Sequence, residues 1–268
     1  MKKLFLGLSA AVIVSTSIFT FAGCEKEEET QTAVQNIEKA TIYDLLNAEN
    51  VHNNALSNIY CTLTENQNLP IQKEQLKILA INHFTDYMVN TYNIPEYYIT
   101  NVLFNMLPDT NIDNITNNIE DPNYRIALYS IFNIFQTESL TYHELDAALT
   151  TIEQNYINSS FNNQIAIIND VFRQSYIYWN ENFENWSNLL SEPENTGLCY
   201  GWVQFKKVIK GDVSGAITGG ISGASFAGVG AVAGALIGAP IGSACAGIDL
   251  ALDSATVRAD RARIKQNN

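Results

Sequence analysis

Four oxygen-bearing side chains between residues 109 and 120 have the spacing of calcium ligands. Asp109, Asn111, Asp113 and Glu120 occupy positions 1, 3, 5 and 12 of an EF-hand-like loop. The position that needs a sharp turn holds Asn114 instead of glycine, and prolines flank the loop on both sides. We therefore interpret the segment as an asparagine-rich loop and predict that the chain binds no metal.

The three histidines also give no catalytic or zinc pattern. His52, His83 and His143 stand far apart, and none has a second ligand at zinc spacing. We interpret His83, on an apolar helical stripe, as a hydrogen-bonded core residue, and His52 as a polar anchor for the end of a neighbouring helix. No nucleophile elbow, phosphate-binding loop or dinucleotide fingerprint occurs. We therefore predict a protein that is not an enzyme, with no catalytic residues and no cofactor.

The first 23 residues have the pattern of an export signal. Lys2 and Lys3 precede an apolar run over residues 4–21, and small residues lead to Cys24. This order predicts a secretory signal peptide over residues 1–23. The run Phe21-Ala22-Gly23-Cys24 resembles a bacterial lipobox, which implies cleavage before Cys24 and a lipid attached to its thiol. Ordinary secretion and an uncleaved N-terminal anchor are the alternatives.

An acidic segment follows the lipidation cysteine. Lys26, Glu27, Glu28 and Glu29 open a polar stretch that we expect to be an extended tether over residues 24–40. The lysine with acids after it resembles the surface-export signal of Bacteroidota-type lipoproteins, which implies display on the outer face of the outer membrane. A solvated spacer without signal function is the alternative.

The charge and the cysteines bound the function further. Without residues 1–23 the chain keeps 13 basic and 28 acidic residues, a net charge of −15. Such a surface argues against nucleic acid as a partner. After lipidation three cysteines remain, and Cys61 and Cys199 are a candidate disulfide in an exported protein. Buried free thiols are an equally good interpretation, with Cys245 inside the apolar C-terminal segment.

Residues 41–197 predict a bundle of six or so helices. Apolar side chains recur at helical spacing from Val51 to about residue 190. Asp121-Pro122 predicts one helix start, Thr141 with Glu144 predicts a capping box, and Ser160 is placed to cap a long helix. An aromatic cluster between residues 176 and 186 favours core packing, with a membrane-interface belt as the alternative. The sequence shows no strand pattern, and we predict an all-α fold, an irregular helical bundle plus a C-terminal hairpin.

The chemistry of residues 198–252 is that of close helix packing. Two sets of glycines keep a four-residue step, so each set lies on one helix face; they are Gly211, Gly215, Gly219 and Gly223, then Gly230, Gly234, Gly238 and Gly242. Such small-residue rows let two backbones approach, as in paired membrane helices. We predict a glycine-zipper helical hairpin, followed by a polar tail over residues 253–268.

The hairpin has three interpretations. Residues 213–248 carry no charge, but only ten of these 36 residues are large and apolar. The segment is therefore not apolar enough to be an obligatory membrane span. The hairpin could cross a membrane, pack on the helical body, or pack on the body and insert after release. Burial of the glycine faces distinguishes the first two.

Four segments carry a wider resemblance. The lipobox, residues 52–56, residues 175–179 and residues 210–216 resemble a loosely defined group of Bacteroidota-type surface lipoproteins with a helical body and a glycine-zipper tail. The tail also resembles the zipper segments of bacteriocins. The resemblance implies an outer-membrane protein whose hairpin mediates membrane association or self-association. A surface binding or scaffold module with the hairpin in its core is the alternative.

Overall fold

We describe a computed structural model of the chain, which defines residues 48–66, 73–105, 111–117, 119–137, 140–190, 202–224 and 230–266. The predicted signal peptide, Cys24, the tether with Lys26, Glu27, Glu28 and Glu29, and Cys199 lie outside these residues, so the structure does not bear on them. The described helices all belong to the unit that spans Thr41–Asn268. None of the described residues forms a strand, and the predicted all-α class is confirmed.

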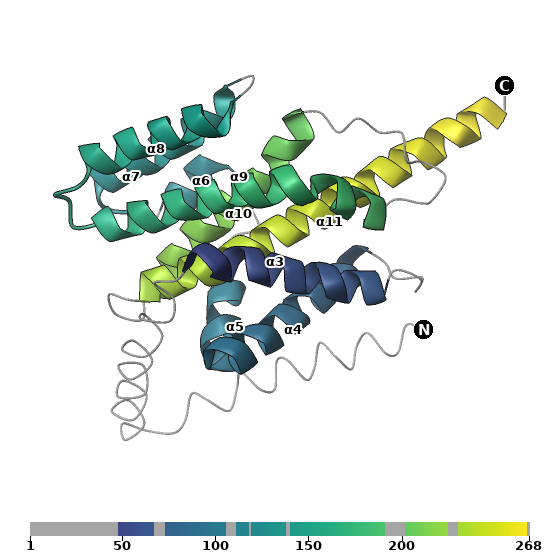
Figure 1. Ribbon diagram of the computed structural model, residues 1–268, viewed down its shortest axis with the longest axis horizontal. Coiled ribbons are helices and arrows are strands. Elements are labelled where there is room, and N and C mark those ends of the chain that lie inside the picture. The colour runs from purple at the N-terminus through teal and green to yellow at the C-terminus, as the bar shows by residue number, and fades with distance from the viewer. Residues whose placement is uncertain are drawn as a thin grey trace. The chain divides into compact units, whose positions relative to one another are not determined.

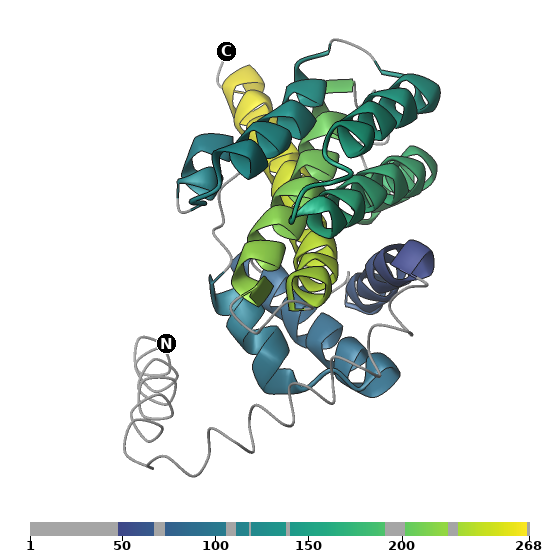
Figure 2. The same cartoon turned by 90° about the vertical axis from the view of Figure 1, so that its left-hand side faces the viewer.

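Helices of very different lengths make up the structure. In chain order they are α3 (Ala48–Glu65), α4 (Lys73–Tyr92), α5 (Glu96–Asn105), α6 (Ile112–Thr116), α7 (Pro122–Asn133), the 3₁₀ turn η1 (Ile134–Gln136), α8 (Tyr142–Asn155), α9 (Asn162–Leu190), α10 (Trp202–Ala224) and α11 (Gly230–Gln266). The α10–α11 hairpin lies between α3–α5 on one side and α6–α9 on the other (Figure 1). Figure 2 shows the same order from the side.

Local sequence sets several of the helix ends. The Asp121 side chain accepts hydrogen bonds from the backbone N–H groups of Asn123 (2.8 Å) and Tyr124 (3.3 Å), with proline at the first helical position of α7. Thr141 and Glu144 form the predicted capping box of α8. The predicted cap at Ser160 is one residue too early, because α9 begins at Asn162 and its N-cap position is Phe161. The predicted polar tail continues α11 as far as Gln266.

The candidate calcium loop contains a helix instead. Asn111 is the N-cap of α6, and its side-chain oxygen accepts a hydrogen bond from the backbone N–H of Asp113 at 3.0 Å. The Asp113 carboxylate accepts a hydrogen bond from the Tyr129 hydroxyl. These bonds use the Asn111 and Asp113 side chains for helix capping and packing, while Asp109 lies outside the described residues.

The core runs through the hairpin and both flanking groups. Apolar side chains of α3, α4, α5, α7, α8, α9, α10 and α11 belong to one cluster of buried residues. Within it Trp179 is fully buried and Trp186 is 3% exposed, and their ring centroids lie 5.2 Å apart. The aromatic cluster of α9 is therefore core packing, and the hairpin shares this core instead of standing apart from it.

Candidate functional site: the glycine hairpin and its buried ion pair

The two glycine rows of the hairpin face each other. The register pairs Gly211 with Gly242, Gly215 with Gly238, Gly219 with Gly234, and Gly223 with Gly230. A Cβ atom built on Gly215, Gly219 or Gly223 would lie 2.0–2.2 Å from the carbonyl oxygen of the paired glycine. Real Cβ contacts essentially never fall below 3.0 Å. The predicted close-packing faces therefore exist, and the partner of each face is the other half of the hairpin.

The glycine spacing explains this register. Both rows advance by four residues, so an antiparallel partner brings a glycine opposite a glycine at every turn. Each carbonyl oxygen then lies in the direction of an α hydrogen on the facing helix, which is the geometry of weak Cα–H···O contacts. Close backbone approach offsets the cost of about 1 kcal/mol that each interior glycine brings relative to alanine.

The other faces of the hairpin are covered by the body. Helices α3, α4, α5 and α9 all pack against α11, and α5, α6 and α9 pack against α10. Every residue from Gly211 to Gly220 is buried. The hydroxyl of Tyr98 on α5 donates a hydrogen bond of 2.7 Å to the carbonyl of Gly230, and the Lys77 ammonium on α4 lies 2.7 Å from the Asp249 carboxylate. The hairpin is thus held along its length.

One described helix segment, Gly230–Asp249, is long and apolar enough to cross a membrane, and 72% of its apolar 18-residue stretch is buried inside the protein. The core helix of a soluble protein passes the same length and composition test. The segment contains Pro240, which has no N–H for the helix ladder, and the position is buried. Length and composition therefore fit both a core helix and a membrane span, while the burial fits the core helix.

A carboxylate lies in the middle of the hairpin. Asp212 is fully buried, and its oxygens accept hydrogen bonds from three side chains on two helices, α3 and α9. The His52 Nε2 on α3 lies 2.8 Å from Oδ1, the Trp179 Nε1 on α9 donates to Oδ2 at 3.0 Å, and the Ser175 hydroxyl donates to Oδ2. Trp179 Nε1 also lies 2.6 Å from the Ser243 hydroxyl on α11. This polar cluster joins the body to both halves of the hairpin.

The hydrogen bonds of His52 indicate that its imidazole is protonated. Its Nε2 faces the Asp212 carboxylate, and its Nδ1 faces the Asn53 side-chain oxygen at 2.9 Å. The Asn53 amide nitrogen donates in turn to the Gln174 side-chain oxygen at 3.2 Å. Two acceptors require two N–H donors, and only the imidazolium has both.

Electrostatics favours the same state. Desolvation by burial would lower the pKa of His52, but attraction to the Asp212 carboxylate, together with hydrogen bonds to Asp212 and Asn53, outweighs it and raises the pKa above its ordinary value. The result is a buried His52–Asp212 ion pair with two further donors on the carboxylate. A pair of this kind gives the packed elements a single register, because breaking it leaves a buried charge without a partner.

The cluster contains serine, histidine and aspartate but is not arranged for nucleophilic catalysis. The Ser175 hydroxyl donates to the aspartate, whereas a catalytic triad places the serine on the histidine. Ser175, His52 and Asp212 are at most 1% exposed, so a substrate has no access to them. The arrangement therefore acts on packing.

The remaining predicted residues lie apart from this cluster. His83 is half-buried instead of fully buried, and His143 is exposed. Cys61 is an exposed free thiol on α3, and its predicted partner Cys199 lies outside the described residues, so the disulfide stays a prediction. Cys245 is a half-buried free thiol, and burial raises its pKa to about 11, which keeps it protonated and unreactive.

Asp212 is the residue that the sequence analysis missed. It directly precedes the uncharged residues 213–248 and follows Gly211, and we assigned it no role beyond marking the start of that segment. A signal existed, because a lone acid beside a row of glycines falls on a helix that must be buried, and a buried acid needs a cation. His52 was correctly interpreted as a polar anchor, but its partner is this carboxylate instead of a helix end.

Comparison with protein families, curated proteins and solved structures finds no match for this chain.

Proposed function

We propose that this chain is a lipid-anchored protein of the bacterial outer membrane and a non-enzymatic binding or scaffold module, with the glycine hairpin as its structural core. The single observation that carries the proposal is the burial of the hairpin. Its glycine faces are occupied by each other, and its outer faces are covered by α3, α4, α5 and α9. The small-residue surface that would pair with a second helix or enter lipid is therefore already in use.

The buried ion pair supports the same proposal. A hairpin built to leave the body would have to separate His52 on α3 from Asp212 on α10. Trp179 and Ser243 add hydrogen bonds that release would also break. These contacts favour a permanently docked hairpin.

The anchor and location come from the sequence. Attachment to the membrane through Cys24 and surface display through Lys26, Glu27, Glu28 and Glu29 follow from the lipobox and export-signal resemblances. Several acyl chains, each contributing about 0.8 kcal/mol per buried methylene, make a stable anchor. The hairpin is then not needed to hold the protein at the membrane. A net charge of −13 for the whole chain argues against nucleic acid as a partner.

A second candidate is a hairpin that mediates membrane association or self-association, as the bacteriocin resemblance implies. The length and apolar composition of Gly230–Asp249 favour it. This candidate requires the hairpin to separate from the body, and it predicts membrane binding by a chain without its lipid.

Liposome flotation separates the two candidates. A lipid-free chain that begins at residue 25 should stay with the soluble fraction and should not release dye from vesicles. Replacing Gly219 and Gly234 with leucine should lower the thermal stability of this chain and leave its partitioning unchanged. Flotation or leakage by the lipid-free chain, lost on these substitutions, would favour the membrane candidate. Radioactive palmitate should label the full chain and not Cys24→Ala, and retained label would refute the anchor.

A further inference from the structure

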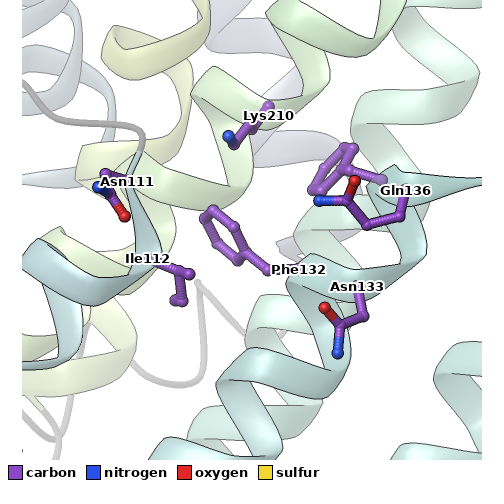
Figure 3. A pocket seen from close by; sticks show the side chains of 7 residues that line it. Asn111, Ile112, Phe132, Asn133, Gln136 and Lys210 are labelled. Atoms are coloured by element: carbon purple, nitrogen blue, oxygen red, sulfur yellow. The ribbon is translucent and has the colours of Figure 1, made fainter.

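The second polar feature of the molecule is a surface pocket away from the glycine faces. It lies between the start of α6, the end of α7 with η1, and the middle of α10, and it holds about 310 Å³ (Figure 3). One cation, three amides and three apolar side chains line it: Lys210, Asn111, Asn133, Gln136, Ile112, Phe132 and Phe135. Pockets for small ligands start at about 300 Å³, so the space suits a molecule of roughly monosaccharide size.

Lys210 is the charged group of this pocket. Its ammonium lies 5.5 Å from the centroid of the Phe132 ring, and its side chain is half-buried. It forms no ion pair with any carboxylate among the described residues. In a chain with 28 acidic and 15 basic residues, Lys210 is thus a half-buried cation at a pocket, and it offers the positive charge that an anionic ligand needs.

The walls of the pocket are held in place from α10. The Lys206 ammonium, one turn before Lys210, donates hydrogen bonds of 3.1 Å to the carbonyls of Phe135 and Thr137. Phe135 stacks on Phe172 of α9 at 4.7 Å between ring centroids. The η1 wall is therefore fixed, and Lys206 is engaged while Lys210 faces the cavity (Figure 3).

The uncharged lining indicates the rest of the ligand. Asn133 and Gln136 are exposed, and an amide offers both donors and an acceptor, which suits hydroxyl groups. Phe132 and Ile112 provide an apolar surface beside these amides. The carboxylate of Asp113, on α6, accepts a hydrogen bond from the Tyr129 hydroxyl.

We infer that this pocket binds a small polyhydroxylated anion, with the carboxylate or phosphate on Lys210 and the hydroxyl groups on the amides. An acidic sugar has this chemistry, and either a uronic acid or a sugar phosphate supplies the negative charge. The inference rests on the proposed function as a binding module and names its ligand class. It does not depend on whether the hairpin enters a membrane.

Calorimetric titration of the full chain, held in a neutral detergent, tests the inference with glucuronate, glucose 6-phosphate and glucose. One or both anions should bind with a Kd of about 1 mM or tighter, and glucose at least about tenfold more weakly. A preference between the anions identifies the charged group. Added salt should weaken binding, because the charge of Lys210 is partly exposed.

Two matched substitutions localise the site. Lys210→Gln should weaken anion binding by at least about tenfold, because a charge-assisted hydrogen bond is lost. Lys207→Gln removes the same charge from an exposed position of the same helix and should change binding less than about twofold. Asn133→Ala should weaken the binding of the hydroxyl-bearing anions and leave the binding of acetate unchanged.

Three results would overturn the inference. They are the absence of binding by both anions up to about 10 mM, equal affinity for glucose, and equal effects of Lys207→Gln and Lys210→Gln. The urea midpoint of Lys210→Gln, followed by the buried Trp179, checks that the variant folds. If Lys210→Gln does not fold, the glucose comparison on the unaltered chain still decides. Because the flotation assay uses no sugar, failure of the pocket and failure of the proposed module give different results.

Discussion

Replacement of Gly219 by alanine adds one methyl group where the two helices of the hairpin are in close backbone contact. The new Cβ would lie 2.1 Å from the carbonyl oxygen of Gly234. Gly220, the next residue of the same helix, provides the matched control, because its Cβ would meet the carbonyl oxygen of Ala231 at 3.3 Å. Both substitutions change glycine to alanine at neighbouring positions of α10. They therefore differ mainly in how close the facing backbone lies to the new methyl group.

The expected difference follows from these distances. Ordinary contact begins at 3.4 Å, so Gly219→Ala requires the two backbones to separate locally by more than about 1 Å. Overpacking of this kind costs about 1–3 kcal/mol or more, and the contact is with rigid backbone. Alanine gains about 1 kcal/mol of helix propensity at either position. We expect Gly219→Ala to lose about 2 kcal/mol of stability and Gly220→Ala to change it by about 0.5 kcal/mol or less.

Urea unfolding followed by tryptophan fluorescence measures this difference. Trp179 and Trp186 are both buried and report on the core that the hairpin shares. A difference of about 2 kcal/mol corresponds to about 4–8 °C in Tm for a domain of this size. Equal stability of Gly219→Ala and Gly220→Ala would refute the reasoning, since the glycine rows would then not be in contact.

Two further predictions concern the body. Because the pKa of His52 is raised in the folded state, its charge contributes fully to stability below about pH 6.5, the pKa of an unfolded histidine. The free energy of unfolding should then fall as pH rises through the folded-state pKa, by at most about 1.4 kcal/mol per pH unit. Urea midpoints across this range should show the fall in the unaltered chain and not in His52→Gln; a flat profile in both would mean that the pair with Asp212 is uncharged. Thr141→Ala removes the N-cap of α8 and should cost about 1 kcal/mol of unfolding free energy. Thr151→Ala, in the same helix away from the cap, is the control, and an equal loss in both would contradict the capping argument.

Much of the fold was readable because its signals are local. Helical spacing of apolar residues, the cap at Asp121 and the capping box at Thr141 each depend on residues within one or two turns. The predicted start of α9 is one residue too early, because a serine marks a helix end only to within a residue or two. The end of the hairpin was placed near residue 252, but α11 continues to Gln266, because a polar composition does not by itself end a helix.

The candidate sites needed contacts between distant parts of the chain. His52 and Asp212 are separated by 160 residues, and no periodicity relates them. The pocket around Lys210 was missed for the same reason, because its walls come from α6, α7, η1 and α10. Side chains that serve a site of this kind have ordinary surroundings in sequence and acquire their chemistry only when the helices meet.

The glycine rows show where the sequence ends and the tertiary structure begins. The sequence by itself determined that the two rows exist, that each lies on one helix face, and that a four-residue step can align them in antiparallel register. It left open whether lipid or protein would surround the hairpin. A segment with so few large apolar residues is well suited neither to a bilayer nor to a protein core. Only the tertiary structure shows what packs on the hairpin, because it brings the two rows into contact with each other and places helices of the body around them. The physical reason is that close packing and a compensated buried charge are properties of several helices together, which no single segment contains.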